Sequence, residues 1–427
     1  MEMKAPRSLN DKRKRKLFRN WYYLTVLQIA QYVLPFVPIP YLVRVLSPEK
    51  FGLVAFAAAM AQFFSVFVEY GFSYSAVKRI AVNKKDKRKV EEIFSCAVII
   101  KAVIACVLAS VFVPLVLFVP QIYGEKTVFI FAFFMIFADI FFTAWFFQGM
   151  EKLKHFAYLY FILESAYAVS VFVFIKKESD YIYVPLLDGI CSFIIGVISI
   201  MLIRKIFGIS FKLQPLSRII FYFKNSWHYF ISDFASNAYT SASVFILGFI
   251  AGNAVVGYYR AALGILLPVK ALFEPVVQAA YPYMSKTAGE SKEKAVRFLK
   301  TYGFSVAFAA LAASGVIFFG SDFIVAVFLG NEYGRSSILL KILSAVPFLY
   351  TLNMIFCMHI MYPFGMKVNF AKISAWAAVI SFLLIPVIAA EYKDFGMACI
   401  MVAGELIVTL MAYRHINSKG FKFFAKT

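Results

Sequence analysis

Long runs of apolar residues, separated by short polar stretches, organise almost the whole chain. A helix that crosses a bilayer needs about 20 mostly apolar residues, and runs of about that length recur along the sequence. The pattern predicts twelve spanning helices, at residues 18–44, 51–75, 93–118, 127–149, 156–175, 182–203, 227–250, 255–284, 300–320, 336–361, 369–390 and 395–413. We therefore expect an all-α polytopic membrane protein.

The second half of the chain repeats features of the first half at an offset of 205 residues. Gly52 recurs as Gly257 and Glu69 recurs as Glu274, in both cases within the second span of the half. This repeat predicts two six-helix lobes, related by a pseudo-two-fold axis along the membrane normal because an even number of spans enters from the same side. The expected lobes are residues 1–205 and 206–427. A single irregular bundle with accidental matches is the alternative.

Composition agrees with a bilayer as the solvent. Of the 427 residues, 62% are hydrophobic and only 16% are charged, whereas soluble domains carry roughly 45–50% apolar and about 25% charged residues. This composition excludes a soluble enzyme, a disordered chain and a secreted disulfide scaffold. The five cysteines lie inside apolar runs and form no metal-type pair, so we interpret them as small apolar residues.

Basic residues indicate how the chain is oriented. Of the 44 Lys and Arg residues, 33 lie in the two tails or in every second connection, and seven lie in the connections between them. Cytoplasmic loops collect Lys and Arg, so we expect both termini in the cytoplasm and need no nucleic acid to explain the net charge of +21. The first apolar run, from Leu17, is too long for a cleavable signal peptide and should remain as a span.

Nothing in the sequence indicates catalysis. The predicted outward loops are too short to fold into a catalytic domain, and no phosphate loop, nucleophile elbow or zinc-protease motif is present. The four histidines show no metal spacing. We therefore expect a protein that is not an enzyme and has neither a metal nor an organic cofactor, with H⁺ or Na⁺ as a coupling ion.

The eighth span carries the most informative charges. Arg260, Lys270 and Glu274 share one helical face, and a charge at mid-bilayer must face a cavity or a partner because exposure to lipid costs about 2.5–3.5 kcal/mol. Lys270 and Glu274 are four residues apart and are predicted to pair, either as a packing contact or beside a substrate. We expect Arg260 to contact an anionic substrate.

Other intramembrane polar groups have candidate roles in binding or ion coupling. Asp233 and Asn237 begin a polar stripe on the seventh span, and Gln28 belongs to one on the first span, before a kink predicted at Pro35, Pro38 and Pro40. Lys101 and Asp139 lie at similar depth and are predicted to form an ion pair, with Glu164 as a competitor. The proton-relay candidates are Asp188 and Glu405.

Several ordered motifs resemble a known family, the Wzx-type O-antigen flippases. The resemblance covers nearly the whole chain. It rests on Pro40–Leu46, Phe51-Gly52, Tyr70-Gly71-Phe72, Lys78–Ala81, Trp145–Glu151, Asn237–Thr240, Val256–Tyr259, Ala280–Tyr283 and Ser285-Lys286.

The resemblance implies a twelve-helix fold of the multidrug/oligosaccharidyl-lipid/polysaccharide exporter (MOP) superfamily. It implies alternating-access transport of an undecaprenyl-diphosphate-linked oligosaccharide repeat unit from the cytoplasmic to the periplasmic leaflet. In related lipid flippases, cations of the first, second and eighth spans hold the diphosphate, and Arg44, Arg79 and Arg260 occupy those helices. Many relatives have a small residue in place of Arg260, so it departs from the pattern and is free to set specificity for an acidic sugar.

The candidate site combines this resemblance with simple chemistry. Arginine matches phosphate oxygens, whereas a sugar needs stacking aromatics and amide partners, which Tyr239, Asn237 and Gln28 would supply. The substrate-binding candidates are Arg44, Arg79, Arg260, Lys270, Asn237, Tyr239 and Gln28. The ion-coupling or gating candidates are Asp233, Glu274, Asp139, Asp188 and Glu69.

The expected setting is the bacterial inner membrane, as a multi-pass protein. Its expected partners are the lipid-linked oligosaccharide, membrane lipid, a polysaccharide polymerase and a chain-length regulator. The alternative function is a cation-coupled multidrug antiporter of the same superfamily, which predicts acids that converge without Arg or Lys beside them.

Overall fold

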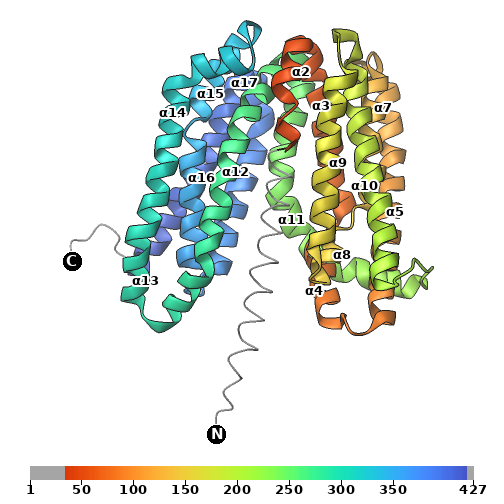
Figure 1. The fold of residues 1–427 in the computed structure, drawn as a ribbon. Helices are drawn as coiled ribbons and strands as arrows, with labels where there is room; N and C mark the ends of the chain where they lie inside the picture. Colours follow the sequence, from red (N-terminus) through yellow and green to blue (C-terminus); the bar gives the residue numbers. More distant parts are fainter. Residues whose placement is uncertain (1–33, 421–427) are drawn as a thin grey trace. The chain divides into compact units, whose positions relative to one another are not determined.

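The computed structural model describes residues 34–420, apart from the side chains of residues 232, 233, 235–241 and 282, and this part of the chain contains helices and no strands (Figure 1). Its α-helices are α2 (Ile39–Val45), α3 (Pro48–Glu69), α4 (Phe72–Asn83), α5 (Lys87–Phe118), α6 (Pro120–Tyr123), α7 (Lys126–Phe141), α8 (Ala144–Gly149), α9 (Leu153–Phe174), α10 (Tyr183–Phe207), α11 (Leu216–Ala251), α12 (Asn253–Glu290), α13 (Lys292–Phe298), α14 (Phe304–Phe328), α15 (Gly334–Leu343), α16 (Val346–Ile355) and α17 (Lys367–Ser418). The 3₁₀ segments are η1 (Leu34–Phe36), η2 (Glu178–Ile182) and η4 (Asn331–Tyr333), and the π-helical segments are η3 (Leu299–Gly303) and η5 (Phe356–Met361).

Helices occupy every predicted span from residue 51 onward. Nine helices of the described chain are long and apolar enough to cross a membrane, which confirms a multi-pass, all-helical membrane protein. Most of the predicted span 18–44 lies outside the described residues. Its end forms the separate short helices η1 and α2, and a break there agrees with the kink expected from Pro35, Pro38 and Pro40.

The predicted span 51–75 is wrong at its end, because α3 stops at Glu69. Tyr70 and Gly71 both adopt a positive φ, of 45° and 68°, a region that glycine enters without strain. A Cβ at Gly71 would lie 2.5 Å from the backbone nitrogen of Phe230 in α11. The close approach of α11 therefore requires a glycine at the point where the chain turns into α4.

The last two predicted spans, 369–390 and 395–413, fall within α17. The helix is interrupted at Lys393, where φ is 51° and ψ is −130°, so the break lies inside the predicted gap between the spans.

Contacts divide the chain into two compact units. Unit 1 contains Ala61–Phe174 and Ile182–Phe234, and unit 2 contains Phe36–Met60, Ile175–Tyr181 and the chain from Ala235 onward. The predicted lobes, 1–205 and 206–427, have different bounds and stay a prediction.

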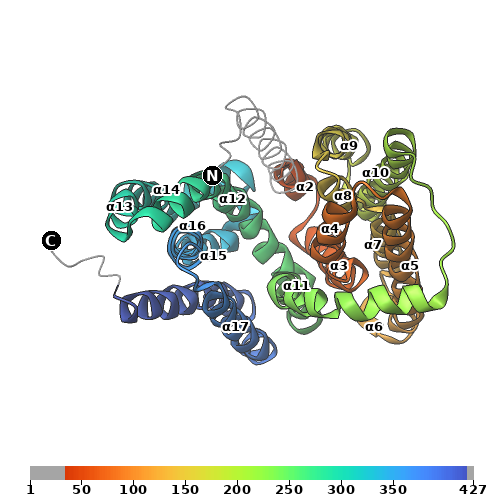
Figure 2. The same ribbon diagram turned by 90° about the horizontal axis from the view of Figure 1, so that it is seen from below.

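Unit 1 is built around α7, which packs on α10 and α5, while α9 packs on α10 (Figure 2). Aromatic side chains fill its core: Phe94, Phe146, Phe147 and Phe156 are at most 1% exposed. Edge-to-face pairs such as Phe94 with Phe146 are typical of aromatic packing. Helix α4 packs against α8 in the same unit.

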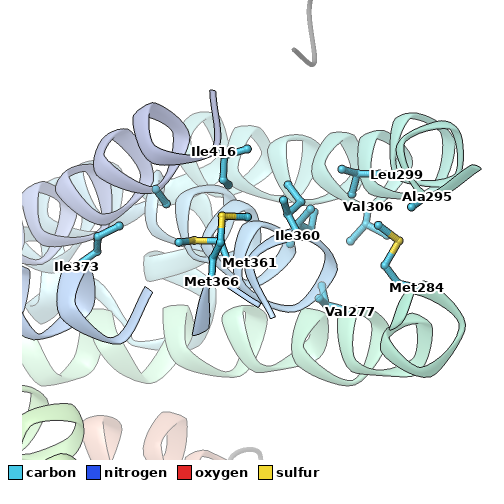
Figure 3. Close-up of a cluster of buried hydrophobic side chains, with 12 residues drawn as sticks. Val277, Met284, Ala295, Leu299, Val306, Ile360, Met361, Met366, Ile373 and Ile416 are labelled. Atoms are coloured by element: carbon cyan, nitrogen blue, oxygen red, sulfur yellow. The ribbon is translucent and has the colours of Figure 1, made fainter. Parts of the chain in front are cut away.

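Unit 2 has a separate apolar core, whose buried residues come from α12, α13, η3, α14, α16, η5 and α17 and from the turn before α17 (Figure 3). Ala295, Leu299 and Val306 belong to it, so one face of the α13–α14 segment is directed inward. The opposite face of that segment is exposed at Lys294, Arg297 and Thr301.

The two glycines that the sequence repeat relates touch each other inside unit 2. A Cβ on Gly52 in α3 would lie 1.8 Å from the carbonyl oxygen of Asn253, and one on Gly257 in α12 would lie 2.1 Å from the carbonyl oxygen of Pro48. The two helices therefore meet through their main chains. In the predicted repeat, these two positions would lie close to the axis that exchanges the lobes.

Candidate functional site

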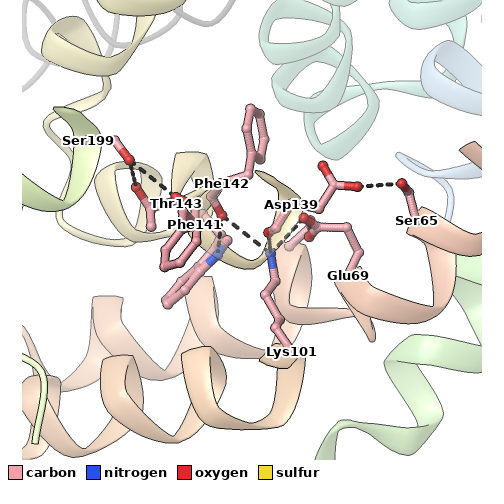
Figure 4. A network of polar contacts seen from close by, with 10 residues as sticks. Ser65, Glu69, Lys101, Asp139, Phe141, Phe142, Thr143 and Ser199 are labelled. Atoms are coloured by element: carbon pink, nitrogen blue, oxygen red, sulfur yellow. Dashed lines mark hydrogen bonds and ion pairs between the residues drawn. The ribbon is translucent and has the colours of Figure 1, made fainter. Parts of the chain in front are cut away.

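A buried lysine joins three helices of unit 1 (Figure 4). The Lys101 ammonium, on α5, is 0% exposed, and its Nζ donates to Oε1 of Glu69 on α3 at 2.7 Å. The same Nζ donates to the carbonyl oxygens of Asp139 at 3.0 Å and Phe142 at 3.3 Å. These three acceptors use the donor capacity of an ammonium group.

The predicted ion pair between Lys101 and Asp139 is wrong. Lys101 contacts the main-chain oxygen of Asp139, and the carboxylate of Asp139 instead accepts a hydrogen bond from the Ser65 hydroxyl. The reason is the break between α7 and α8, where the Asp139 carbonyl oxygen accepts from the Phe142 nitrogen at 3.2 Å and the Phe142 carbonyl oxygen accepts from the Trp145 ring nitrogen at 3.1 Å, so that both oxygens are also open to the lysine. We call Ser65, Glu69, Lys101 and Asp139 the Lys101 network.

Two further acids of unit 1 lie near this network. The Glu164 carboxylate, on α9, is buried and interacts electrostatically with Asp188 on α10, and Asp188 interacts in the same way with Asp139. Glu164 therefore does not compete for Lys101, whose carboxylate partner is Glu69.

A second polar group lies in unit 2, and we call it the Lys270 cluster. It comprises Lys270 and Glu274 of α12, Tyr350 and Asn353 of α16, and Glu405 and Thr409 of α17. The Lys270 ammonium lies 4.0 Å from Oε1 of Glu405 and 3.8 Å from the centre of the Tyr350 ring. The Lys270 side chain is 18% exposed.

The predicted pair of Lys270 with Glu274 is wrong as well. The Tyr350 hydroxyl donates to Oε1 of Glu274 at 2.6 Å, and the lysine turns toward Glu405 and the tyrosine ring. Spacing along one helix allowed the pair, but side chains from α16 and α17 supply closer partners.

Asn353 holds the far end of the cluster in place. Its Nδ2 donates to Oε2 of Glu405 at 2.7 Å, and its Oδ1 accepts from the Thr409 hydroxyl at 2.8 Å. Glu405 therefore keeps a hydrogen bond whether or not Lys270 approaches it. Tyr350 and Asn353 were missed by the sequence analysis, because uncharged residues within an apolar span carry little signal.

The three candidate arginines have separate environments. The Arg44 guanidinium, at the end of α2, donates to the carbonyl oxygen of Val327 near the end of α14, as a helix-end anchor does. Arg79 on α4 lies 5.1 Å from the Tyr222 ring of α11. Arg260 on α12 lies 5.3 Å from the Phe36 ring.

Four candidates cannot be placed. Gln28 and the side chains of Asp233, Asn237 and Tyr239 lie outside the described residues. Within the described side chains, no group of three or more His, Cys, Asp or Glu residues is arranged to hold a metal ion.

An ion pair with two parallel hydrogen bonds in unit 2 was also missed. Arg335 of α15 donates from Nε and Nη2 to the two carboxylate oxygens of Asp394 at 2.7 and 2.6 Å, and Asp394 is 0% exposed. The acid follows directly on the irregular Lys393 in α17. A charge at a predicted break between spans is the signal that would have found it.

Solved transporter structures share this fold. The lipid II flippase MurJ in an inward closed conformation aligns over 92% of this chain and 88% of its own, with a TM-score of 0.69 at 16% identity. An inward-facing multidrug resistance MATE transporter aligns over 95% of this chain and 100% of its own, with a TM-score of 0.64 at 14% identity. The fold is therefore that of the MOP-superfamily membrane transporters.

Sequence comparisons then define the family. A profile described as polysaccharide biosynthesis protein matches residues 17–288, and the chain belongs to this family. An Escherichia coli (strain K12) protein named "Putative O-antigen transporter" is 31% identical over 409 residues, covering 95% of this chain and 98% of its own. A Shigella dysenteriae protein of the same name is 27% identical over 401 residues, covering 93% and 100%.

These relatives confirm the resemblance found in the motifs. The protein is a membrane transporter of polysaccharide biosynthesis by family, and the names of the four relatives describe transporters and a flippase rather than catalytic enzymes.

Proposed function

We propose that this protein moves an undecaprenyl-diphosphate-linked oligosaccharide repeat unit from the cytoplasmic to the periplasmic leaflet of a bacterial inner membrane by alternating access. The observation that carries the proposal is the match over nearly the whole chain to relatives named as O-antigen transporters. In this proposal both termini are cytoplasmic, and a polymerase and a chain-length regulator act on the delivered repeat unit.

The Lys270 cluster supports an anionic substrate. Lys270 lies in the middle of a spanning helix, is partly exposed, and has an ion-pair distance of 4.0 Å, so its ammonium group keeps room for a further acceptor. Arg260 lies on the same helix and would supply the planar donors that fit phosphate oxygens. We assign the substrate contacts first to these two cations, with Arg44, Arg79, Gln28, Asn237 and Tyr239 as further candidates.

Ion coupling is part of the proposal. Each of the two polar groups holds one lysine with two carboxylates, Glu69 and Asp139 in unit 1 and Glu274 and Glu405 in unit 2. A protonatable carboxylate beside a lysine can exchange H⁺ or Na⁺ when the substrate changes the local charge. Glu274, Asp139, Asp188, Glu69 and Asp233 are the coupling candidates.

Substitution of the two cations tests the proposal. Arg260→Ala and Lys270→Ala are expected to lower flipping of a reconstituted lipid-linked oligosaccharide about ten- to 100-fold, since a hydrogen bond to a charged group contributes about 1.5–3 kcal/mol. Arg88→Ala, which removes an exposed charge at the start of α5, is the control. In cells, the variants should lose surface polysaccharide at normal protein level.

Wild-type flipping in both variants would refute the assigned contacts. If the purified protein instead exports cationic drugs and leaves the lipid-linked oligosaccharide in place, the antiporter is the correct function.

A further inference from the structure

A basic hollow opens on the surface of unit 2 where α12 ends and α13 begins. Its volume is about 540 Å³, within the range of small-ligand sites. Three cations line it, Lys286 from α12 and Lys294 and Arg297 from α13, and the exposed Tyr283 stands at its edge. The only carboxylate among its described lining residues is Glu290, which lies 3.7 Å from Lys286.

The fold directs these cations to one place. Ser291, in an extended conformation, ends α12 and caps α13 by accepting a hydrogen bond from the Lys294 backbone nitrogen at 3.3 Å. Since the face of α13 that carries Ala295 is buried in the apolar core (Figure 3), Lys294 and Arg297 must point away from it. Within the described chain, neither cation has a carboxylate partner.

Exposed apolar side chains lie further along the two helical segments that border the hollow, α12 on one side and α13, η3 and α14 on the other. Phe304 and Phe308 of α14, which follow Arg297 and Thr301 on the same helical face, are 70% and 63% exposed. Leu272, on α12, is 59% exposed. The Tyr302 hydroxyl donates to the carbonyl oxygen of Val276 at 2.6 Å and ties the two helices together.

A ligand that matches this surface has an anionic head and long apolar chains. Two unpaired cations prefer a phosphate group, to which arginine can donate two parallel hydrogen bonds. Phe304, Phe308 and Leu272 lie within segments apolar enough to cross a membrane, where acyl chains would cover them. We propose that this hollow binds the phosphodiester headgroup of an anionic phospholipid, a site separate from the Lys270 cluster and independent of the transported substrate.

Lipid retention by the purified full-length chain tests the site. The chain is placed in nanodiscs of phosphatidylcholine with increasing phosphatidylglycerol, and the lipids kept after gentle detergent transfer are counted by native mass spectrometry. We expect one tightly retained phosphatidylglycerol in the wild type. The Lys294→Gln/Arg297→Gln double variant should bind it at least tenfold more weakly.

The matched control is Lys300→Gln/Lys372→Gln, which removes the same charge from exposed positions outside the hollow and should retain the lipid as the wild type does. Thermal unfolding in phosphatidylcholine alone shows whether each variant is folded. Equal retention in the two double variants would overturn the proposal. A second arm adds inorganic phosphate: full displacement of phosphatidylglycerol at millimolar phosphate would show a site for soluble phosphate compounds and would also overturn it.

Discussion

The sequence repeat places an acid at equivalent positions in two regions, and the structure gives the two acids different partners. Glu69 accepts a hydrogen bond from a lysine on another helix, Lys101, whereas Glu274 accepts one from the Tyr350 hydroxyl. The position equivalent to Lys101 is Val306, which lies in the apolar core of unit 2. The two acids that the predicted repeat relates therefore have different kinds of hydrogen-bond donor, an ammonium group for Glu69 and a phenol for Glu274.

The two lysines also differ in how fully their charge is satisfied. Lys101 is 0% exposed and has three oxygen acceptors within 3.3 Å, but Lys270 is 18% exposed and lies 4.0 Å from its carboxylate. A charge with complete coordination is costly to remove, because its partners stay behind, and it has no donor left for a ligand. A charge with incomplete coordination contributes less to stability and can bind an anion.

The largest effect is expected for Lys101→Met. Removing one member of a buried ion pair costs about 3–5 kcal/mol, and this change also removes the donor to the carbonyl oxygens of Asp139 and Phe142, while within the described chain Glu69 keeps only a hydrogen bond from the Ser73 hydroxyl at 3.2 Å. We expect a loss of that size in the free energy of unfolding, measured by denaturant titration in detergent. The double variant Lys101→Met/Glu69→Gln should recover part of it, and a single-variant loss below about 1 kcal/mol would contradict complete coordination.

A smaller effect on stability is expected for Lys270→Met. The exposed part of the side chain and the long ion-pair distance limit the loss to about 1 kcal/mol, since Glu405 keeps its hydrogen bond from Asn353. Transport should nevertheless fall about tenfold. The same unfolding titration and the flipping assay measure the two quantities, and a stability loss equal to that of Lys101→Met would remove the distinction between the lysines.

The smallest effect is expected at an exposed pair that serves as the baseline. Lys84 lies 2.8 Å from Glu151, but the two side chains are 39% and 37% exposed. Surface pairs contribute about 0–1 kcal/mol, so Lys84→Gln should change the free energy of unfolding by no more than this and less still at high salt. A loss in the free energy of unfolding comparable to that of Lys101→Met would show that the loss does not depend on how deeply an ion pair is buried.

Spans could be predicted from the sequence more reliably than contacts. Lipid imposes a length and an apolar composition on every crossing helix, so even the gap between 390 and 395 was located, and it contains the irregular Lys393. The end of α3 was misplaced because Tyr70 and Gly71 give no hydropathy signal. There the turn depends on the approach of α11.

Partners of charges could not be predicted in the same way. Lys270 and Glu274 satisfy the spacing rule for a pair. In the structure, however, Glu274 accepts from Tyr350, and Lys270 lies beside Tyr350 and Glu405, which belong to other helices. The depth of Lys101 correctly predicted Asp139 as a neighbour. The prediction named the Asp139 carboxylate as the partner, whereas the structure shows the Asp139 carbonyl oxygen. The depth of a residue in the membrane can be counted along one helix. The rotation of neighbouring helices and the position of a helix break are known only from the three-dimensional packing.

The contact between Gly52 and Gly257 limits how far the two copies of the repeat can drift apart. Lys101 and Val306 show that paired positions are able to diverge, since a side chain can be exchanged when its neighbours adjust. At the two glycines the obstacle to any added methyl group is a main-chain oxygen, which no mutation of a neighbour removes. These two positions should therefore remain glycine when the other matched positions change.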